Sequence, residues 1–212
     1  IIAYSSQVGA SKIALELGYQ NLKDNYYNFG FSKPISVNFP AAAFGLINTK
    51  EAVSERELAS LGYGYGFTVS PFQITAAYSV FANQGIKKDF KLLMNDEVTS
   101  QRVISETSAG HTLEALEQVV KIGTGKKADI KGFSEGGKTG TVHRTISGSG
   151  YAKDLYRASF VGIAPLSNES LTIFVSIEDP GLNSYSGGMI AAPLFAKIAE
   201  SSLNYLGFIE DE

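Results

Sequence analysis

The sequence predicts an α+β protein in which an antiparallel sheet is flanked by helices, an α/β/α sandwich. Two observations support this fold class. Apolar residues at helical spacing dominate up to about residue 123, and the pattern then changes to strand-like runs between residues 139 and 179. A final helical segment follows, and helices before and after a group of strands suggest a sheet covered on both faces. Because no repeat or linker-like run divides the chain, we expect residues 1–212 to be part of one domain.

Four helices are expected in the first half of the chain. In the segment "SSQVGASKIALELG" (residues 5–18), the residues from Val8 on suit a short helix that Gly18 stops, with Ser5 to Gln7 just before it. Residues 19–30 suit a second helix. Residues 31–62 look irregular, with one short helix near residues 51–61. The clearest helix lies within residues 68–85.

This clearest helix has local start and stop signals. Ser70 suits the N-cap, Pro71 the first helical position and Gln73 the partner residue of a capping box, and Gly85 ends the helix. Residues 86–104 then suggest a short hairpin.

The second half supplies the expected sheet. Residues 105–123 predict a helix with one apolar stripe, and residues 139–145, 157–165 and 171–179 read as three strands. The middle strand is apolar on both faces, so we expect it to be buried on both. Residues 192–207 predict a last helix with Pro193 near its start and Gly207 past its end.

Composition excludes several classes of function. The net charge is −3, the pI is about 5.5 and no block of like charges occurs, which argues against nucleic acid or a polybasic membrane contact as a partner. The longest apolar run, residues 39–47, is too short to span a bilayer, and we expect no transmembrane segment or signal peptide. Nothing near Ile1 resembles a natural start, so the chain is expected to be a piece of a longer protein.

Neither thiol nor metal chemistry is expected. The chain has no cysteine, which excludes disulfides and thiol catalysis. Its two histidines, His111 and His143, lack ligand-like spacing, so neither a metal nor a cofactor is expected. A structural role for His143 is favoured over that of a catalytic base, because no carboxylate partner is evident.

The segment "GFSEGGKTGTVHRT" (residues 132–145) fits two motifs. Gly132 to Thr139 matches G-x-x-x-x-G-K-T, a phosphate-binding loop, and Lys138 to Thr141 spells K-T-G-T. A phosphate-binding loop needs a buried strand before it and a helix after it. The preceding segment is polar and lysine-rich and the following one is a poor helix, so the strand interpretation is favoured.

As an edge strand, K-T-G-T makes chemical sense beside a cleft. Gly140 would let a substrate backbone lie close, and the Thr141 amide could point at an oxyanion. Lys138 adds positive charge, and the hydroxyls of Thr139 and Thr141 could bind a carboxylate. The alternative is an ordinary edge strand with a solvated lysine.

Three further stretches carry a family resemblance. Residues 61–85, "LGYGYGFTVSPFQITAAYSVFANQG", closely resemble the Tyr-Gly signature of class B penicillin-binding proteins, particularly the division-specific septal transpeptidases. Residues 5–15 resemble the family's S-x-N segment and its following helix, and residues 185–198 its Y-G-G-x-x-A-P-x-F segment. With K-T-G-T, these stretches lie in family order over nearly the whole chain.

The resemblance implies a transpeptidase-like fold and a D,D-transpeptidase that cross-links peptidoglycan stem peptides through an acyl-enzyme, which β-lactams trap. It implies a site at the periplasmic face of the bacterial inner membrane, anchored by an upstream helix, with division-complex proteins as partners.

By position, Ser5 would relay a proton to the leaving amine, and Gln7 stands where the family has asparagine. Lys138 would set the electrostatics around Ser5. Thr139 and Thr141 would bind the donor carboxylate, the Thr141 amide would form half the oxyanion hole, and Tyr185 would border the cleft.

Two departures from the family pattern bear on activity. The family's nucleophile lies in S-x-x-K, which occurs nowhere in these 212 residues. We expect that motif before Ile1, and the chain alone to be inactive toward penicillin. Gln7 reaches one methylene further than asparagine, which leaves open a weakened relative or a penicillin-binding sensor. A β-lactamase is a third alternative, against which the Tyr-Gly signature argues.

Overall fold

The structure, a computed structural model, describes residues 1–35, 43–47, 52–146, 150–167, 169–181 and 184–211. Contacts between residues divide it into two compact units. Residues 1 and 5–109 form the first unit, and residues 2–4 with 110–212 form the second. The segment before Ser5 therefore packs with the C-terminal half of the chain.

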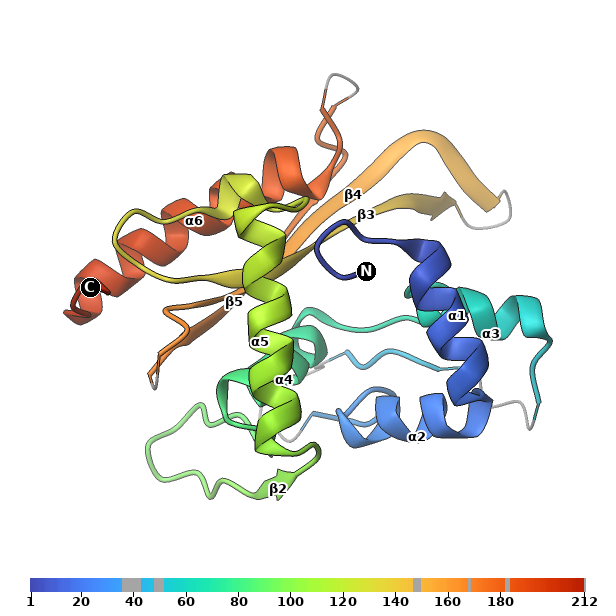
Figure 1. The fold of residues 1–212 in the computed structure, drawn as a ribbon, viewed down its shortest axis with the longest axis horizontal. Coiled ribbons are helices and arrows are strands. Elements are labelled where there is room, and N and C mark those ends of the chain that lie inside the picture. Colours follow the sequence, from blue (N-terminus) through green and yellow to red (C-terminus); the bar gives the residue numbers. More distant parts are fainter. Residues whose placement is uncertain (36–42, 48–51, 147–149, 168, 182–183, 212) are drawn as a thin grey trace. The chain divides into compact units, whose positions relative to one another are not determined.

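The first unit is mainly helical (Figure 1). Its helices and its small antiparallel hairpin, as far as the described residues go, are α1 (Gln7–Leu17), α2 (Tyr19–Asn28), α3 (Glu55–Gly62), α4 (Pro71–Ala82), β1 (Ile86–Lys88) and β2 (Ser100–Arg102). These elements confirm the expected helices and the hairpin. Residue 51, where the third helix was expected to begin, lies outside the described residues.

Close backbone contact joins α1 to α3. A Cβ on Gly62 would lie 2.5 Å from the Cβ of Ala14 and 2.8 Å from the carbonyl oxygen of Ala10, so only glycine fits there. The Ser11 hydroxyl donates to the Ala59 carbonyl at 3.1 Å. This packing fixes the direction in which α1, and hence its N-terminus, points within the unit.

The predicted N-terminal cap of α4 is present, whereas the helix ends at Ala82, with Asn83 as its C-cap, before the expected Gly85. Ser70 and Gln73 form the capping box and Pro71 is the first helical residue. Gln73 also has a tertiary role that the sequence does not announce, because it is 2% exposed. Its Nε2 donates to the carbonyls of Gly30 and Lys33, and its Oε1 accepts the Gly45 amide.

The second unit is built on an antiparallel sheet whose order, among the described residues, is β3-β4-β5. Its elements are α5 (Glu106–Lys121), η1 (Lys126–Ala128), β3 (Gly136–Ile146), β4 (Gly150–Ala164), β5 (Leu171–Glu178) and α6 (Gly187–Leu206). The first turn of α5, before Gly110, is assigned to the first unit. The expected antiparallel sheet with helices is confirmed. The middle strand is buried along Phe160–Pro165, as its two-faced apolar pattern predicted.

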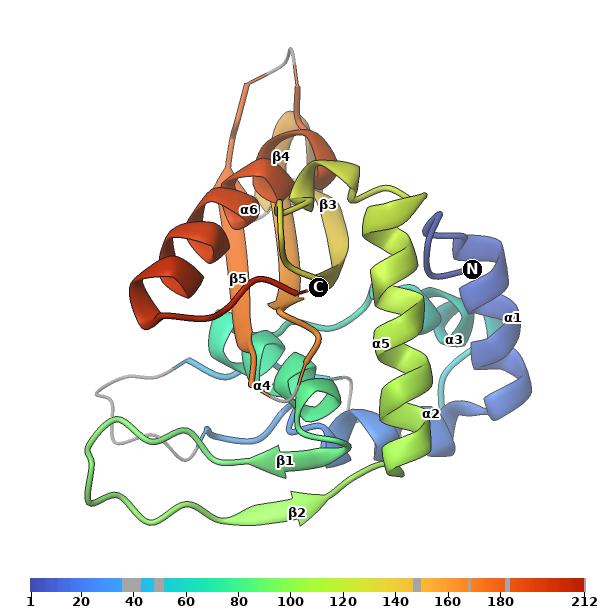
Figure 2. The ribbon, with the colours of Figure 1, turned by 60° about the vertical axis from the view of Figure 1, so that its left-hand side comes forward.

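Helix α6 crosses one face of this sheet (Figure 2). Phe160 of β4 and Phe195 of α6 are fully buried, with ring centroids 4.9 Å apart, at the centre of the core. On the other face, β3 begins against α5, since a Cβ on Gly136 would lie 2.9 Å from the backbone nitrogen of Glu117. The start of β3 is thus held from both sides, which positions the residues that follow it.

The start of the last helix corrects the sequence prediction. The helix begins at Gly187 and not at residue 192 as expected, so Pro193 lies inside it. The physical reason is tertiary: the Gly187 amide, which has no partner within the helix, donates to the Thr141 hydroxyl at 2.9 Å. Gly207 ends the helix in the left-handed conformation, as predicted.

Candidate functional site

The K-T-G-T residues lie on an edge strand, as predicted. Strand β3 pairs with β4 alone in the described part of the sheet, and Lys138 faces Val161 across the ladder while Gly140 faces Ser159. Thr139 and Thr141 lie on the face covered by α6, because Thr139 pairs with Phe160. Among the described residues, β3 has no strand partner on its other edge.

The Lys138 ammonium reaches the hydroxyl of its neighbour. Strand alternation puts the Lys138 side chain on the opposite face from Thr139, yet Nζ donates to the Thr139 carbonyl at 3.1 Å and to its Oγ1 at 3.4 Å. The side chain therefore curls around the edge of β3. Burial lowers the pKa of Lys138, because desolvation disfavours the charged ammonium.

Each threonine hydroxyl of the motif also has a fixed partner. Thr139 Oγ1 lies 2.8 Å from the hydroxyl of Thr124, in the loop between α5 and η1. Thr141 Oγ1 accepts the amide of Gly187. The two hydroxyls are held by a loop and by a helix N-terminus, so the motif is built by three elements of the second unit.

Aromatic rings extend this site along the sheet. Tyr185, which precedes α6, stacks on Tyr156 of β4 with centroids 4.2 Å apart and an interplanar angle of 18°. The His143 ring also packs against Tyr156, with ring centroids 4.5 Å apart. Tyr185 is 44% exposed, so part of its surface is accessible to solvent.

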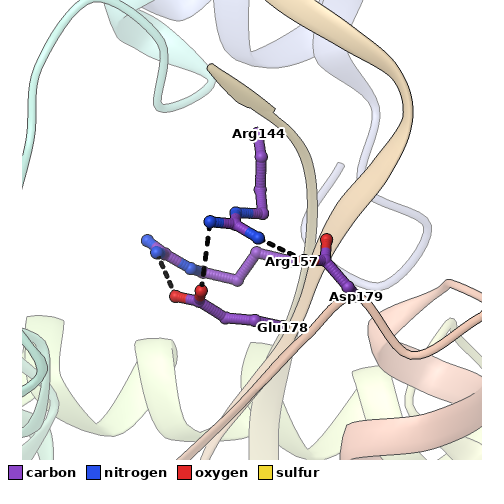
Figure 3. Close-up of polar contacts among 4 residues, drawn as sticks. All are labelled: Arg144, Arg157, Glu178 and Asp179. Atoms are coloured by element: carbon purple, nitrogen blue, oxygen red, sulfur yellow. Dashed lines mark hydrogen bonds and ion pairs between the residues drawn. The ribbon is translucent and has the colours of Figure 1, made fainter. Parts of the chain in front are cut away.

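An ion-pair cluster ties the far part of β3 to the rest of the sheet (Figure 3). Arg144 of β3 pairs with both Glu178 and Asp179, and Arg157 of β4 pairs with Glu178. The Arg157 hydrogen bond and charge, with a smaller effect from Arg144, lower the pKa of Glu178. These ion pairs could not be found from local sequence, because the arginines are distant in sequence from Glu178 and Asp179.

Ser5 and Gln7 both belong to the first unit. Ser5 is exposed and has a φ of 53°, a left-handed conformation that is uncommon for serine. Ser6 is the N-cap of α1, accepting the Gly9 amide at 3.2 Å, and Gln7 is the first helical residue. The sequence placed Gln7 just before the helix, so the structure extends α1 by one position.

The Tyr-Gly signature has a structural explanation. Gly64 and Gly66 have φ values of 94° and 87°, which residues with side chains rarely adopt. Tyr63 and Tyr65 pack with centroids 5.5 Å apart, and the Tyr63 hydroxyl is 3.2 Å from that of Ser60. Both tyrosines therefore pack within their own segment.

The described residues contain neither a metal-binding group of side chains nor a membrane-spanning helix. There, no group of three or more histidine, cysteine or acidic side chains is arranged to hold a metal ion. In the same part of the chain, no helix combines the length and the apolar character needed to cross a membrane.

Comparison with known families identifies the arrangement. The model of the penicillin binding protein transpeptidase domain matches residues 1–200. The chain belongs to this family. Its helices and antiparallel sheets are those of penicillin-binding transpeptidase domains, which confirms the resemblance and the fold class.

Individual relatives agree with the assignment to the penicillin-binding protein family. The probable peptidoglycan D,D-transpeptidase PbpC of Pseudomonas aeruginosa is 34% identical over 213 residues, covering 100% of this chain and 38% of that protein. The TP domain of penicillin-binding protein 3 from Burkholderia pseudomallei superposes with a TM-score of 0.88 at 34% identity, covering 98% of this chain and 63% of that one. Penicillin-binding protein 3 from Mycobacterium, solved in complex with aztreonam, gives a TM-score of 0.86 at 27% identity, with 100% and 52% covered. The chain thus spans less than two thirds of each.

Proposed function

We propose that the chain is part of a serine D,D-transpeptidase that cross-links peptidoglycan stem peptides during septal wall synthesis through an acyl-enzyme. Membership of the transpeptidase family and the name of the Pseudomonas relative support this reaction. The observation that carries the proposal is local. An ammonium and two fixed hydroxyls meet on one strand edge, where a substrate strand with a terminal carboxylate can lie.

In this mechanism the K-T-G-T residues bind the donor. The hydroxyls of Thr139 and Thr141 hold the terminal carboxylate of D-Ala–D-Ala, and Gly140 lets the peptide backbone approach. The Thr141 amide supplies half of the oxyanion hole, where charge develops on the attacked carbonyl. Tyr185, which stacks on Tyr156 and is 44% exposed, borders the bound peptide.

Ser5 and Lys138 handle the proton. Ser5 passes a proton to the leaving D-alanine, and Lys138 sets the electrostatics around its hydroxyl. The partial burial that lowers the pKa of Lys138 supports this role, because a charge acts more strongly on its neighbours where water is excluded. The left-handed backbone of Ser5 is further support, since such conformations gather at functional sites.

The nucleophile must come from chain outside these 212 residues, because S-x-x-K is absent from them. The attacking serine, its lysine and the rest of the domain complete the site. The same proposal places the protein at the periplasmic face of the inner membrane, held by an upstream helix, with division proteins and β-lactams among its partners. The aztreonam complex of the Mycobacterium structure supports β-lactam binding.

A penicillin-binding sensor, or a weakened relative, is the second candidate. Gln7 favours it, because asparagine is the family residue at this position and the longer glutamine, exposed at the first turn of α1, must re-aim its amide. Such a protein would be acylated by penicillin without transferring a peptide to an amine.

Labelling with a fluorescent penicillin tests the proposal. The full-length protein should be acylated, its Lys138→Met variant should be slowed by about a hundredfold, and the isolated 212-residue chain should not react. Full-length protein that also transfers a donor peptide to an acceptor amine is a transpeptidase, whereas acylation without transfer indicates the sensor.

Labelling of the isolated chain, or full activity of Lys138→Met, contradicts the assigned roles. Gln7→Asn should change the rate only a few-fold, and a large gain would indicate a crippled site.

A further inference from the structure

Thr124 adds a hydroxyl to the K-T-G-T strand that no motif contains. It lies in the Gly-Thr-Gly segment 123–125, its side chain is exposed, and its Oγ1 is 2.8 Å from Thr139 Oγ1. Lys138 Nζ reaches the same oxygen at 3.4 Å. Thr139 Oγ1 is therefore shared by an ammonium and a second hydroxyl.

The backbone around Thr124 is clamped within the second unit. Its amide donates to the Ala3 carbonyl at 3.1 Å, and the Gly125 amide donates to the Val119 carbonyl at 2.9 Å. A Cβ on Gly123 would lie 2.0 Å from the Ala3 oxygen, and one on Gly188 would lie 2.2 Å from the Thr124 oxygen. With the backbone fixed and a β-branched side chain, Thr124 has little freedom to move its hydroxyl.

The clamp also connects Thr139 with the segment that leads to Ser5. Ala3 packs in the second unit, and it precedes Ser5 by two residues. Covalent geometry limits the Cα atoms of residues two apart to about 7 Å. Thr124 thus contacts two segments. Its amide binds Ala3, in the chain before Ser5, and its hydroxyl contacts Thr139 of the K-T-G-T strand.

Either hydroxyl of the pair can be the donor, and proton counting allows Thr124 to donate to Thr139. A lysine ammonium only donates, so Thr139 Oγ1 accepts from Lys138. If Thr124 also donates to this oxygen, both lone pairs of Thr139 are used and its single proton is left for an anionic acceptor. Such a chain of donors strengthens the last hydrogen bond in it.

We propose that Thr124 is a positioning residue, which aims the Thr139 hydroxyl at the carboxylate of the donor peptide. This inference rests on the proposed function, since it requires a carboxylate to bind at Thr139. It predicts that the Thr124 hydroxyl matters for ligands that carry the carboxylate and not for ligands in which it is masked.

The test uses the full-length protein with Thr124→Val, which keeps the shape and removes the hydroxyl, and Thr124→Ser, which keeps the hydroxyl. Acylation rates are measured with benzylpenicillin and with its methyl ester. Thr124→Val should lower the rate with benzylpenicillin about tenfold and the rate with the ester less than about twofold. Thr124→Ser should stay within about threefold of the unmodified protein with both.

Equal losses with the acid and the ester would reduce Thr124 to a structural residue, and no loss with either would overturn the proposal. If the unmodified protein is not acylated at all, the proposed function fails and a second measurement decides the contact. Amide hydrogen exchange at residues 124 and 139 should then be several times faster in Thr124→Val and unchanged in Thr124→Ser. Unchanged exchange in Thr124→Val overturns the positioning role as well.

Discussion

The amide of Gly187 donates to the hydroxyl of Thr141 at 2.9 Å, so the first turn of α6 is capped by a residue of the K-T-G-T strand. The same glycine leaves no room for a side chain. A Cβ there would lie 2.2 Å from the Ser159 carbonyl oxygen and 2.5 Å from that of Gly140. The helix start and the edge strand are therefore coupled through one glycine.

Gly187→Ala should break this coupling. The added methyl forces α6 away from β3, with a loss of about 2 kcal/mol in the free energy of unfolding and slower penicillin labelling of the full-length protein. Urea unfolding and labelling measure the two effects. Gly110→Ala is the matched control, because it lies in α5 with nothing within 4 Å of its added Cβ. It should raise the free energy of unfolding by about 0.5 kcal/mol, and equal effects of the two changes would contradict the coupling.

This capping also explains what the sequence could and could not predict. The start of α4 was predictable because Ser70, Pro71 and Gln73 are within four residues of one another. The start of α6 was not, since its capping group is 46 positions away in β3, and Ser-Gly-Gly by itself resembles a loop.

The candidate site divides in the same way. K-T-G-T and its edge position followed from local pattern, because the strand alternation and the motif are contained in a few residues. Thr124 was missed because its only signal is a Gly-Thr-Gly between a helix and a lysine-rich loop. Its partner Thr139 is brought to it by the packing of the second unit. The roles of Ser5 and Gln7 stay predictions.

Gln73→Glu should destabilise the first unit strongly. In place of the Nε2 donor, a carboxylate oxygen would face the carbonyls of Gly30 and Lys33 in a buried position. We expect a loss of about 3 kcal/mol in the free energy of unfolding at pH 7, partly recovered at low pH where the carboxyl is protonated. Chemical denaturation of both proteins measures it. Gln101→Glu, on the exposed strand β2, should change the value by less than about 0.5 kcal/mol, and a similar loss there would count against the hub role of Gln73.

Glu135 should make stability depend on pH. This carboxyl is 6% exposed, just before β3, and burial raises its pKa to about 7, with Asp129 and Glu117 adding to the rise. The Ile130 amide, which donates to Oε2 at 3.2 Å, and Lys121 oppose it. Because the folded pKa lies above the unfolded one, the stabilising effect of the neutral form is complete below about pH 4.5 and is lost as pH rises to about 7.

Replacement by glutamine tests this pH dependence. Glu135→Gln keeps an acceptor for the Ile130 amide and cannot ionise, so it should flatten the stability profile between about pH 4.5 and 7. The difference between the two proteins should grow toward high pH, by about 3 kcal/mol in favour of glutamine. Urea unfolding at a series of pH values measures the profile. Identical slopes for both proteins would show that Glu135 titrates normally.

The arginine cluster predicts an ordered pair of pKa changes at Glu178. Arg157 lowers this pKa by both a hydrogen bond and its charge, whereas Arg144 acts by charge alone. Arg157→Gln should therefore raise the pKa of Glu178 further than Arg144→Gln does, as followed by NMR titration of the side-chain carboxyl. Both shifts should shrink at high salt, since the groups are solvent-exposed and their charges are screened. A larger shift in Arg144→Gln would mean that Arg144, which also bridges to Asp179, is the main partner of the Glu178 carboxylate. Equal shifts would mean that the hydrogen bond from Arg157 adds nothing.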